Sequence, residues 1–544
     1  MAVGGGGGGG GGGNEFQPHP VKEQLPGIDF CVSSSPAWPE AILLGFQHYL
    51  VMIGTVVIIS TIIVPLMGGG NMEKAEVINT FLFVAGINTL LQSLFGTRLP
   101  VVMGASYAFI IPIISISLSR RFNMYVDPHQ RFRQTMRAVQ GALILSSLLQ
   151  MVIGFFGFWR ILARFLSPLS AVPLVTLTGL GLFVHGFPQY IPSMIKSDKI
   201  MLGRFAVLLS VVIVWNGSDT GNKELLDILW CFKGFFAWCV GALPSMIDHL
   251  TQAVAVSNDR GSFGLSICNF GTVTVIIDPL LIRVPYPFQW GRPTFNAGDV
   301  FSMMGAAFVA IVESTGTFIA ASRYGSATHI PPSVISRGVG WLGIGTLLDG
   351  IFGTGSGSTA SVENAGLLGL TRIGSRRVIQ ISAAFMLFFS VLGKFGAILA
   401  SIPLPIVAAL YCVLFAYVVS AGLALLQFCN LNSFRTKFII GFALFMGLSV
   451  PQYFNEYLLI SSRGPVHTRA TWFNNIMQVI FSSPATVAII VAFLLDTTLS
   501  RGHSSTRRDS GRHWWEKFRY FNQDTRSEEF YALPYNLNRF FPSF

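Results

Sequence analysis

The chain of 544 residues is 51% hydrophobic and only 11% charged, whereas soluble domains carry about 25% charged residues. This composition, with a mean hydropathy of +0.58, excludes a water-soluble globular protein. The net charge of +11 does not indicate nucleic-acid binding, because the basic residues lie in short loops and in the C-terminal tail, where they set membrane orientation. The six cysteines show no metal-ligand spacing, so we interpret them as small apolar filler.

Apolar segments long enough to cross a hydrocarbon layer of about 30 Å follow a glycine-rich tail, 1–38, that we predict to be disordered. In the first half of the chain they cover 40–66, 75–95, 100–116, 137–159 and 165–183. In the second half they cover 297–321, 338–353, 359–370, 378–400, 405–428, 437–454 and 476–495. A polar, aromatic tail, 498–544, ends the sequence. The pattern predicts an all-α polytopic membrane protein.

Basic residues in alternate loops indicate how these segments are oriented. Arg98 follows the second segment, Arg323 and Arg337 lie in one later loop, and the arginines of 372–377 lie in the next loop but one. The positive-inside rule then predicts an integral, multi-pass protein with both termini in the cytosol. The basic loop at 120–133 departs from the pattern.

Two apolar segments are interrupted at corresponding positions of the two halves. Small and polar residues break the third segment at 103–109, and the stretch 356–377 breaks a segment of the second half. Non-helical backbone at membrane depth is tolerated where it lines a cavity, and paired broken segments indicate an inverted-repeat transporter. We therefore expect a solute site where the two breaks meet.

Glu313 is the one acid in the central part of its segment. Because an ionised carboxylate at the bilayer centre costs at least about 2.5–3.5 kcal/mol, Glu313 must face a polar cavity or carry a proton. Either state suits a proton-coupled solute site that accepts hydrogen bonds from ring N–H groups. A structural hydrogen bond to a neighbouring helix is the alternative. We assign Asp349, another acid within an apolar segment, a structural role only.

Glu363 and Asn364 fall at the second break and offer carboxylate acceptors beside an amide that both donates and accepts. That set matches a planar heterocycle with alternating N–H and C=O groups. Thr371 adds a hydroxyl to the same stretch. The alternative is that Asn364 only caps a half-helix, since helix ends are polar for that reason alone.

Further candidates come from the first half of the chain. Gln47 and His48 put polar groups in the first segment, where a histidine can equally hydrogen-bond across the bundle. Tyr107 and Phe109 could stack on an aromatic solute or serve as core packing. Ser106 is small enough to let backbone approach the solute.

Several motifs resemble those of the nucleobase–ascorbate transporter family, in particular its plant branch. They are VESTG at 312–316, ENAGLLGLTR at 363–372, QH at 47–48 and GASYAF at 104–109, with RFLSPLSAVPLV, SATHIPPSVISRGVGW, FCNLNSFR and GPVHTRA elsewhere. The resemblance covers about 25–188 and 283–544, and the 363–372 motif is its most specific part.

The resemblance implies fourteen helices in two inverted repeats of seven, of which 13–14 are expected here. A core domain (39–158 and 283–401) would hold the solute, and a gate domain (159–215 and 402–497) would form a homodimer contact. The core would move like an elevator, coupled to a proton or to sodium, without a bound cofactor. Glu313 would bind the nucleobase and His48 would support the site. Glu363, where ascorbate carriers have proline, favours a nucleobase. A plasma-membrane location is a further expectation.

The sequence departs from this family between 188 and 282. One helix after residue 188 is missing, and 216–282 resembles nothing familiar, although 225–247 and 265–282 are apolar enough to be candidate crossings. We interpret the region as a gene-model artefact or a splice variant. A missing helix would invert every later crossing unless another segment compensates.

Four functions compete at this point. A proton-coupled nucleobase transporter leads, with purines such as xanthine and uric acid, or uracil, as solutes. An ascorbate or organic-anion carrier on the same fold is the near alternative, and a non-transporting splice product comes from another class. An intramembrane enzyme has least support, because no nucleophile–base pair or metal cluster is evident.

Overall fold

The computed structural model describes residues 28–122, 124–163, 167–183, 283–392, 404–461, 464–499 and 530–533. Within these residues, five helices are long and apolar enough to cross a membrane, namely α1 (Trp38–Met67), α2 (Asn71–Leu94), α4 (Pro128–Phe155), α10 (Ala297–Tyr324) and α16 (Phe434–Ser461). The prediction of an all-α polytopic membrane protein is therefore confirmed.

Shorter elements complete the two halves. The first half adds β1 (Met103–Ala105), η2 (Tyr107–Phe109), α3 (Ile110–Ser117), η3 (Arg120–Phe122), α5 (Phe158–Ala163) and α6 (Pro168–Leu180). The second half adds α11 (Pro332–Phe352), β2 (Ser358–Ala360), α12 (Val362–Thr371), α13 (Arg376–Val391), α15 (Leu404–Ala424), η6 (Leu425–Phe428), α17 (Thr471–Ser482) and α18 (Pro484–Thr498).

Local sequence explains where several helices begin and end. The Asn296 side chain accepts hydrogen bonds from the Gly298 and Asp299 amides and so caps α10. Gly68 ends α1 and Gly353 ends α11, both with positive φ (97° and 73°), a conformation that a side chain would strain.

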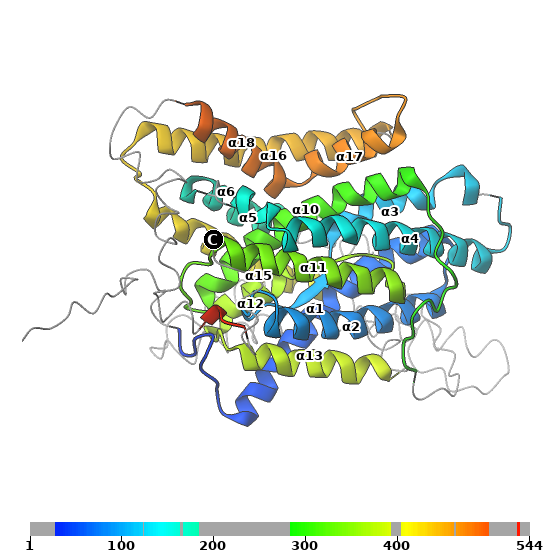
Figure 1. Cartoon of the computed structure of the whole chain (residues 1–544), viewed down its shortest axis with the longest axis horizontal. Helices are drawn as coiled ribbons and strands as arrows, with labels where there is room; N and C mark the ends of the chain where they lie inside the picture. The colour runs from blue at the N-terminus through cyan, green and yellow to red at the C-terminus, as the bar shows by residue number, and fades with distance from the viewer. Residues whose placement is uncertain are drawn as a thin grey trace, which may run out of the picture.

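The two halves pack in a reciprocal pattern. α2 packs against α13 as α4 packs against α11, and α1 crosses α13 as α10 crosses α4. β1 and β2 pair antiparallel between them. Helices of one half thus pack on the other half in the same way as their counterparts do. Two inverted repeats produce this arrangement, so the expected repeat architecture is confirmed for α1–α4 and α10–α13. α16, α17 and α18 lie together along one edge of the molecule, across from α2 and α13 (Figure 1).

Glycines allow the tightest helix crossings. A Cβ at Gly154 of α4 would lie 2.1 Å from the amide nitrogen of Gly340 in α11, and the Ser336 hydroxyl donates to the Gly154 carbonyl at 2.7 Å. A Cβ at Gly366 of α12 would lie 2.1 Å from the Leu414 carbonyl oxygen of α15. Small residues bring membrane helices together in this way because lipid offers no hydrophobic driving force.

One predicted crossing is not a single straight helix. Residues 476–495, expected as a single span, form parts of α17 and α18, which meet at 82°. Ser483 lies between them in an extended conformation (φ −91°, ψ 113°). Pro484 is the cause, because a residue before proline is pushed out of the helical region.

The predictions made for 188–282, namely the missing helix, the unfamiliar 216–282 and the candidate crossings at 225–247 and 265–282, lie outside the described residues. So do those for most of the two tails, 1–27 and 500–529 with 534–544.

Gly154→Ala tests the α4–α11 crossing. We expect the purified protein to melt at a lower temperature, because forcing a methyl group against the Gly340 backbone costs about 1–3 kcal/mol. Gly441→Ala in α16 is the matched control, since no atom lies within 4 Å of a Cβ there. Equal melting temperatures for the two variants would contradict the crossing.

Candidate functional site

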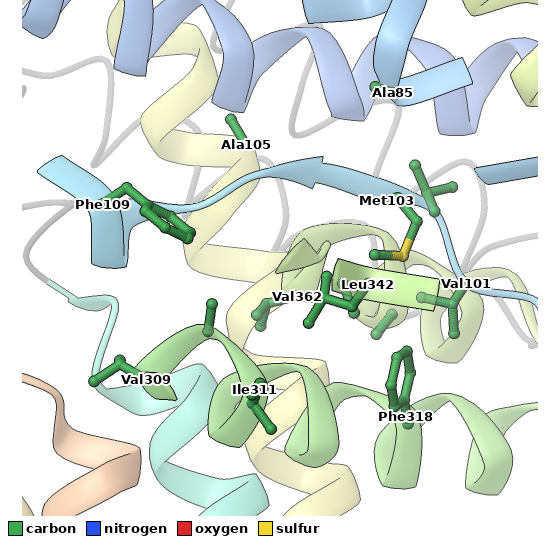
Figure 2. Packing of buried hydrophobic residues seen from close by; sticks show 14 of the residues in the cluster. Ala85, Val101, Met103, Ala105, Phe109, Val309, Ile311, Phe318, Leu342 and Val362 are labelled. Carbon is green, nitrogen blue, oxygen red and sulfur yellow. The ribbon is translucent and has the colours of Figure 1, made fainter. Parts of the chain in front are cut away.

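The two broken segments meet in a short antiparallel strand pair. Met103 is opposite Ala360, and Ala105 is opposite Ser358. Beyond the strands, the Ser106 amide donates to the Gly357 carbonyl at 3.1 Å, and the Ser361 amide to the Val102 carbonyl at 2.9 Å. Figure 2 shows β1 with Met103 and Ala105 passing over α10, which carries Val309, Ile311 and Phe318. The backbone groups of both breaks thus find partners away from water.

Hydroxyl groups of neighbouring helices hold the strand pair in place. The Met103 amide donates to Thr89 Oγ1 of α2 at 2.9 Å, and the Ala360 amide to Ser314 Oγ of α10 at 3.2 Å. Ser314 and Thr359 also share a hydrogen bond of 2.7 Å between their hydroxyls. These bonds tie both strands to the long helices that flank them.

Asp349 anchors the far side of β2. Its carboxylate accepts from the Ser358 hydroxyl at 2.5 Å and from the Thr354 hydroxyl at 3.3 Å, and the Asn88 amide donates to the same Ser358 hydroxyl at 3.0 Å. Asp349 is fully buried. The geometry fits the structural role expected for it.

α12 begins directly after β2, and its first turn carries Glu363 and Asn364. Ser361 caps the helix: its hydroxyl accepts from the Asn364 amide nitrogen at 3.3 Å and donates to the Glu363 carboxylate at 2.8 Å. The Asn364 side chain donates to Ser361 at 2.9 Å and lies 2.9 Å from His48 Nδ1 through its oxygen. His48 therefore contacts the 363–372 motif through its hydrogen bond to the Asn364 side chain, and both side chains are buried.

Glu313 connects α10 to the bend between α17 and α18. Its carboxylate, halfway along α10, accepts a hydrogen bond of 3.0 Å from Ser483, the residue at the α17–α18 bend. Nearby, a Cβ at Gly316 would lie 2.5 Å from the Thr178 hydroxyl of α6. α10 thus meets α6 and the α17–α18 bend at the level of this carboxylate.

A small pocket lies where these elements converge. Its lining brings together three of the predicted site residues, Tyr107, Glu313 and Glu363. The other lining residues come from the strands and from α6, α12 and α18, namely Ala105, Thr359, Val362, Leu177, Thr178, Gly181, Leu182, Pro484 and Ala485. Its volume of about 30 Å³ exceeds the roughly 10–15 Å³ that one water needs and is too small for a planar ring. Binding a ring therefore requires the lining elements to part.

The remaining predicted residues lie outside this lining. Phe109 is fully buried, and a Cβ at Gly357 would lie 2.7 Å from its ring, so Phe109 packs behind the strands. Ser106 caps η2 by accepting from the Ala108 amide at 3.3 Å. Thr371 bonds the Leu367 carbonyl at the far end of α12. Gln47 is half-buried on α1, one residue before His48.

Two residues of the site were not predicted. Ser361 could have been found as the cap of α12, since it stands three residues before Asn364. Ser483 could have been found from the Ser-Pro pair within an apolar segment, which signals a break. Within the described residues, no group of three or more His, Cys, Asp or Glu side chains is placed to hold a metal ion.

The family model and the related sequences agree on one family. A model described as the permease family matches residues 39–456. The chain is similar to nucleobase-ascorbate transporter 4 of Arabidopsis thaliana, with 62% identity over 551 residues that cover 98% of this chain and 99% of that protein. It is also similar to the maize nucleobase-ascorbate transporter LPE1, with 52% identity covering 96% of this chain and 98% of that protein. The transmembrane domain of the cyanobacterium bicarbonate transporter BicA aligns over 85% of this chain and 99% of that domain, at 14% identity and a TM-score of 0.40.

A double-mutant cycle tests the bond between Glu313 and Ser483. We expect Glu313→Gln and Ser483→Ala to be non-additive in thermal unfolding, with a coupling of about 0.5–3 kcal/mol, because the two side chains contact each other. Thr497→Ala on α18 is the control partner, since its hydroxyl bonds only carbonyls of its own helix. Additive effects in the Ser483 cycle would show that the bond does not form.

Proposed function

The chain belongs to the permease family, among the nucleobase–ascorbate transporters of plants, and from that premise we propose that it is a secondary-active transporter of nucleobases. It is an integral, multi-pass membrane protein. The finer parts of the proposal are the solute, the coupling ion, the elevator-like motion and the absence of any enzymatic activity. The observation that carries it is the pocket in which Tyr107, Glu313 and Glu363 meet.

A nucleobase suits the groups that line this pocket. Its ring N–H groups can donate to the two carboxylates, and charge-assisted hydrogen bonds of this kind are about twice as strong as neutral ones. Tyr107 offers an aromatic face for stacking. Xanthine, uric acid and uracil all present N–H and C=O groups around a planar ring. Asn364, Ser106 and Phe109 would act from behind the lining, with Gln47, His48 and Thr371 in support.

An anionic solute suits the pocket less well. The lining residues that the structure describes include two carboxylates and neither Lys nor Arg. Like charges in a desolvated site repel an ionised ascorbate, which discriminates against it without any specific contact. This charge pattern favours a neutral nucleobase such as uracil over the ascorbate or organic-anion alternative. Uric acid, which is an anion at neutral pH, would meet the same repulsion as ascorbate.

Glu313 is the residue we propose to carry the coupling proton. An ionised carboxylate at this depth is costly, and the Ser483 hydroxyl is the partner that the hydrogen bonds of the described residues give it. A proton taken up by Glu313 after the solute has bound would remove the charge during the crossing, and the carbonyl oxygen of the neutral carboxyl group would still accept a hydrogen bond from the ring. Sodium is the alternative coupling ion, and no bound cofactor is proposed.

The contacts of Glu313 also support a motion of one domain against another. We propose that α1–α4 with α10–α13 form the core domain and that α6 with α15–α18 belong to the gate domain, which would also form the homodimer contact. The bond from Glu313 to Ser483 joins the two. An elevator-like motion of the core would break this bond and open the pocket to the solute. In this proposal the chain interacts with membrane lipid and with the nucleobase, and it does not bind nucleic acid.

The two described ends of the chain support a cytosolic location for both termini. The Asp29 amide donates to the Arg372 carbonyl at 3.1 Å, and Arg376 donates to the Phe530 carbonyl at 3.0 Å. Both ends therefore lie at the same end of the molecule, which requires an even number of crossings between them. Arginines gather at this end, as the positive-inside rule expects of a cytosolic face. A plasma-membrane location completes the proposal.

Uptake measurements test the solute and the site. In cells that lack their own nucleobase uptake, we expect radiolabelled xanthine or uracil to accumulate, and Glu313→Gln to lower uptake about tenfold or more, because a hydrogen bond to a charged group contributes about 1.5–3 kcal/mol. Glu456→Gln on α16, an exposed acid, is the matched control and should transport normally.

Other outcomes of the uptake assay would identify the alternatives. Uptake of ascorbate without uptake of any nucleobase would establish the anion carrier. Absence of all uptake by protein delivered to the cell surface would favour the non-transporting form.

A reporter fused after Phe544 tests the orientation. We expect a C-terminal glycosylation acceptor to stay unmodified and a C-terminal fluorescent or enzymatic reporter to be active in the cytosol. A glycosylated C-terminus would contradict the cytosolic location.

A further inference from the structure

The last described residues of the chain, Phe530–Leu533, are inserted into the folded protein although they follow a polar tail. Phe530 is 5% exposed, Tyr531 1% and Leu533 7%. Figure 1 shows this short turn, in red, beside α12 and the start of α13. A terminal segment with nothing to hold it would stay in water, so its burial points to a site built to receive it.

Two arginines hold the backbone of this segment. Arg337, near the start of α11, donates to the Tyr531 carbonyl at 3.0 Å and to the Gly96 carbonyl at 2.6 Å. Arg376, at the start of α13, donates to the Phe530 carbonyl at 3.0 Å and to the carbonyl of Arg98 at 2.7 Å. Each guanidinium uses its planar fork to join the tail to the loop between α2 and β1.

The side chain of Tyr531 occupies the centre of the contact. Its hydroxyl donates to the Thr328 carbonyl at 2.6 Å, and its ring belongs to the same buried cluster as the strand residues Met103 and Ala105. Burial raises the pKa of Tyr531 well above its usual value, so the hydroxyl keeps its proton and remains a donor. A large aromatic side chain with a satisfied polar tip is typical of an anchor residue in a binding site.

Electrostatics explains why the site needs an occupant. Burial lowers the pKa of Arg337 and of Arg376, and the nearby charge of Arg98 lowers each of them further. The ion pairs among the described residues join none of these three arginines to a carboxylate. The guanidinium groups of Arg337 and Arg376 have backbone carbonyl oxygens as their acceptors. If the tail leaves, Arg337, which is buried, and Arg376, which is half-buried, each lose one charge-assisted hydrogen bond, which is costly.

The loop that these arginines hold leads directly to the solute pocket. Gly96 and Arg98 lie in the connection that follows the end of α2 at Leu94, and β1 begins at Met103. Arg98 itself adopts a positive φ of 60°, a strained conformation for a non-glycine residue, which its surroundings must enforce. The docked tail is one of those surroundings, since Arg376 bonds the Arg98 carbonyl and the tail together.

We propose that the end of the core at which α11 and α13 begin is a peptide-binding site, and that its ligand is the chain's own Phe530–Leu533 segment. The ligand class is an aromatic pair followed by an aliphatic residue, Phe-Tyr-x-Leu, bound through its carbonyls by Arg337 and Arg376 and anchored by the tyrosine ring. The tether to α18 supplies the segment at high effective concentration. Docking of this segment holds the α2–β1 loop in the conformation that positions β1 for pairing with β2.

A cleavage experiment on the full-length protein tests the proposal. A protease site is inserted between Arg508 and Asp509, an affinity tag is fused after Phe544, and the purified protein is cleaved in detergent. We expect the tagged fragment to remain with the membrane protein through size-exclusion chromatography. Tyr531→Ala should release it at least about tenfold faster, since the anchor of a binding site contributes more than about 1.4 kcal/mol.

Two further variants define what holds the fragment. Tyr531→Phe is the matched control: it keeps the buried ring and loses only the bond to Thr328, so its release should fall between those of wild type and Tyr531→Ala. Arg376→Lys keeps the charge but not the fork and should also speed release. Tyr531 lies in the tail, so a sharp size-exclusion peak for its variants shows that the core is folded.

Immediate loss of the wild-type fragment, or equal retention in wild type and Tyr531→Ala, would overturn the proposal. The assay measures no transport, so its outcome is independent of the proposed function.

Discussion

Backbone that crosses a membrane without forming a helix must find hydrogen-bond partners out of reach of water, and this requirement shapes the centre of the protein. The β1–β2 pair meets it by joining the two breaks to each other, and the hydroxyls of Thr89 and Ser314 satisfy one amide in each strand. Because each break needs the other, the two halves of the chain must pack against each other for the centre to be stable.

The chemistry of the pocket follows from the same pairing. β2 ends at Ala360, so α12 begins inside the protein and its first turn carries Glu363 beside the pocket. Glu313 approaches from α10, the helix whose Ser314 bonds β2. Its hydroxyl partner, Ser483, comes from the α17–α18 bend. The Glu313 carboxylate therefore lies where the elements around the strand pair meet the α17–α18 bend.

The sequence predicted the parts of this arrangement that polar residues mark within apolar segments. Both breaks, Glu313 and Glu363 could be identified because polar groups at membrane depth are energetically costly and therefore rare. Contacts between residues that are far apart in the chain could not be predicted from the sequence. Phe109 looks like a stacking residue in the sequence, yet packs behind the strands against Gly357. The bend at Ser483 and the burial of Tyr531 depend on neighbours that periodicity does not reveal.

The central claim is that a nucleobase binds between the two carboxylates at the strand pair. The most direct measurement is an experimental structure of the purified protein with xanthine or uracil bound. We expect the ring to lie beside Tyr107 with its N–H groups donating to Glu313 and Glu363. The pocket should then have a larger volume than the present one of about 30 Å³. A ring bound away from β1 and β2, with neither carboxylate in contact, would contradict the account.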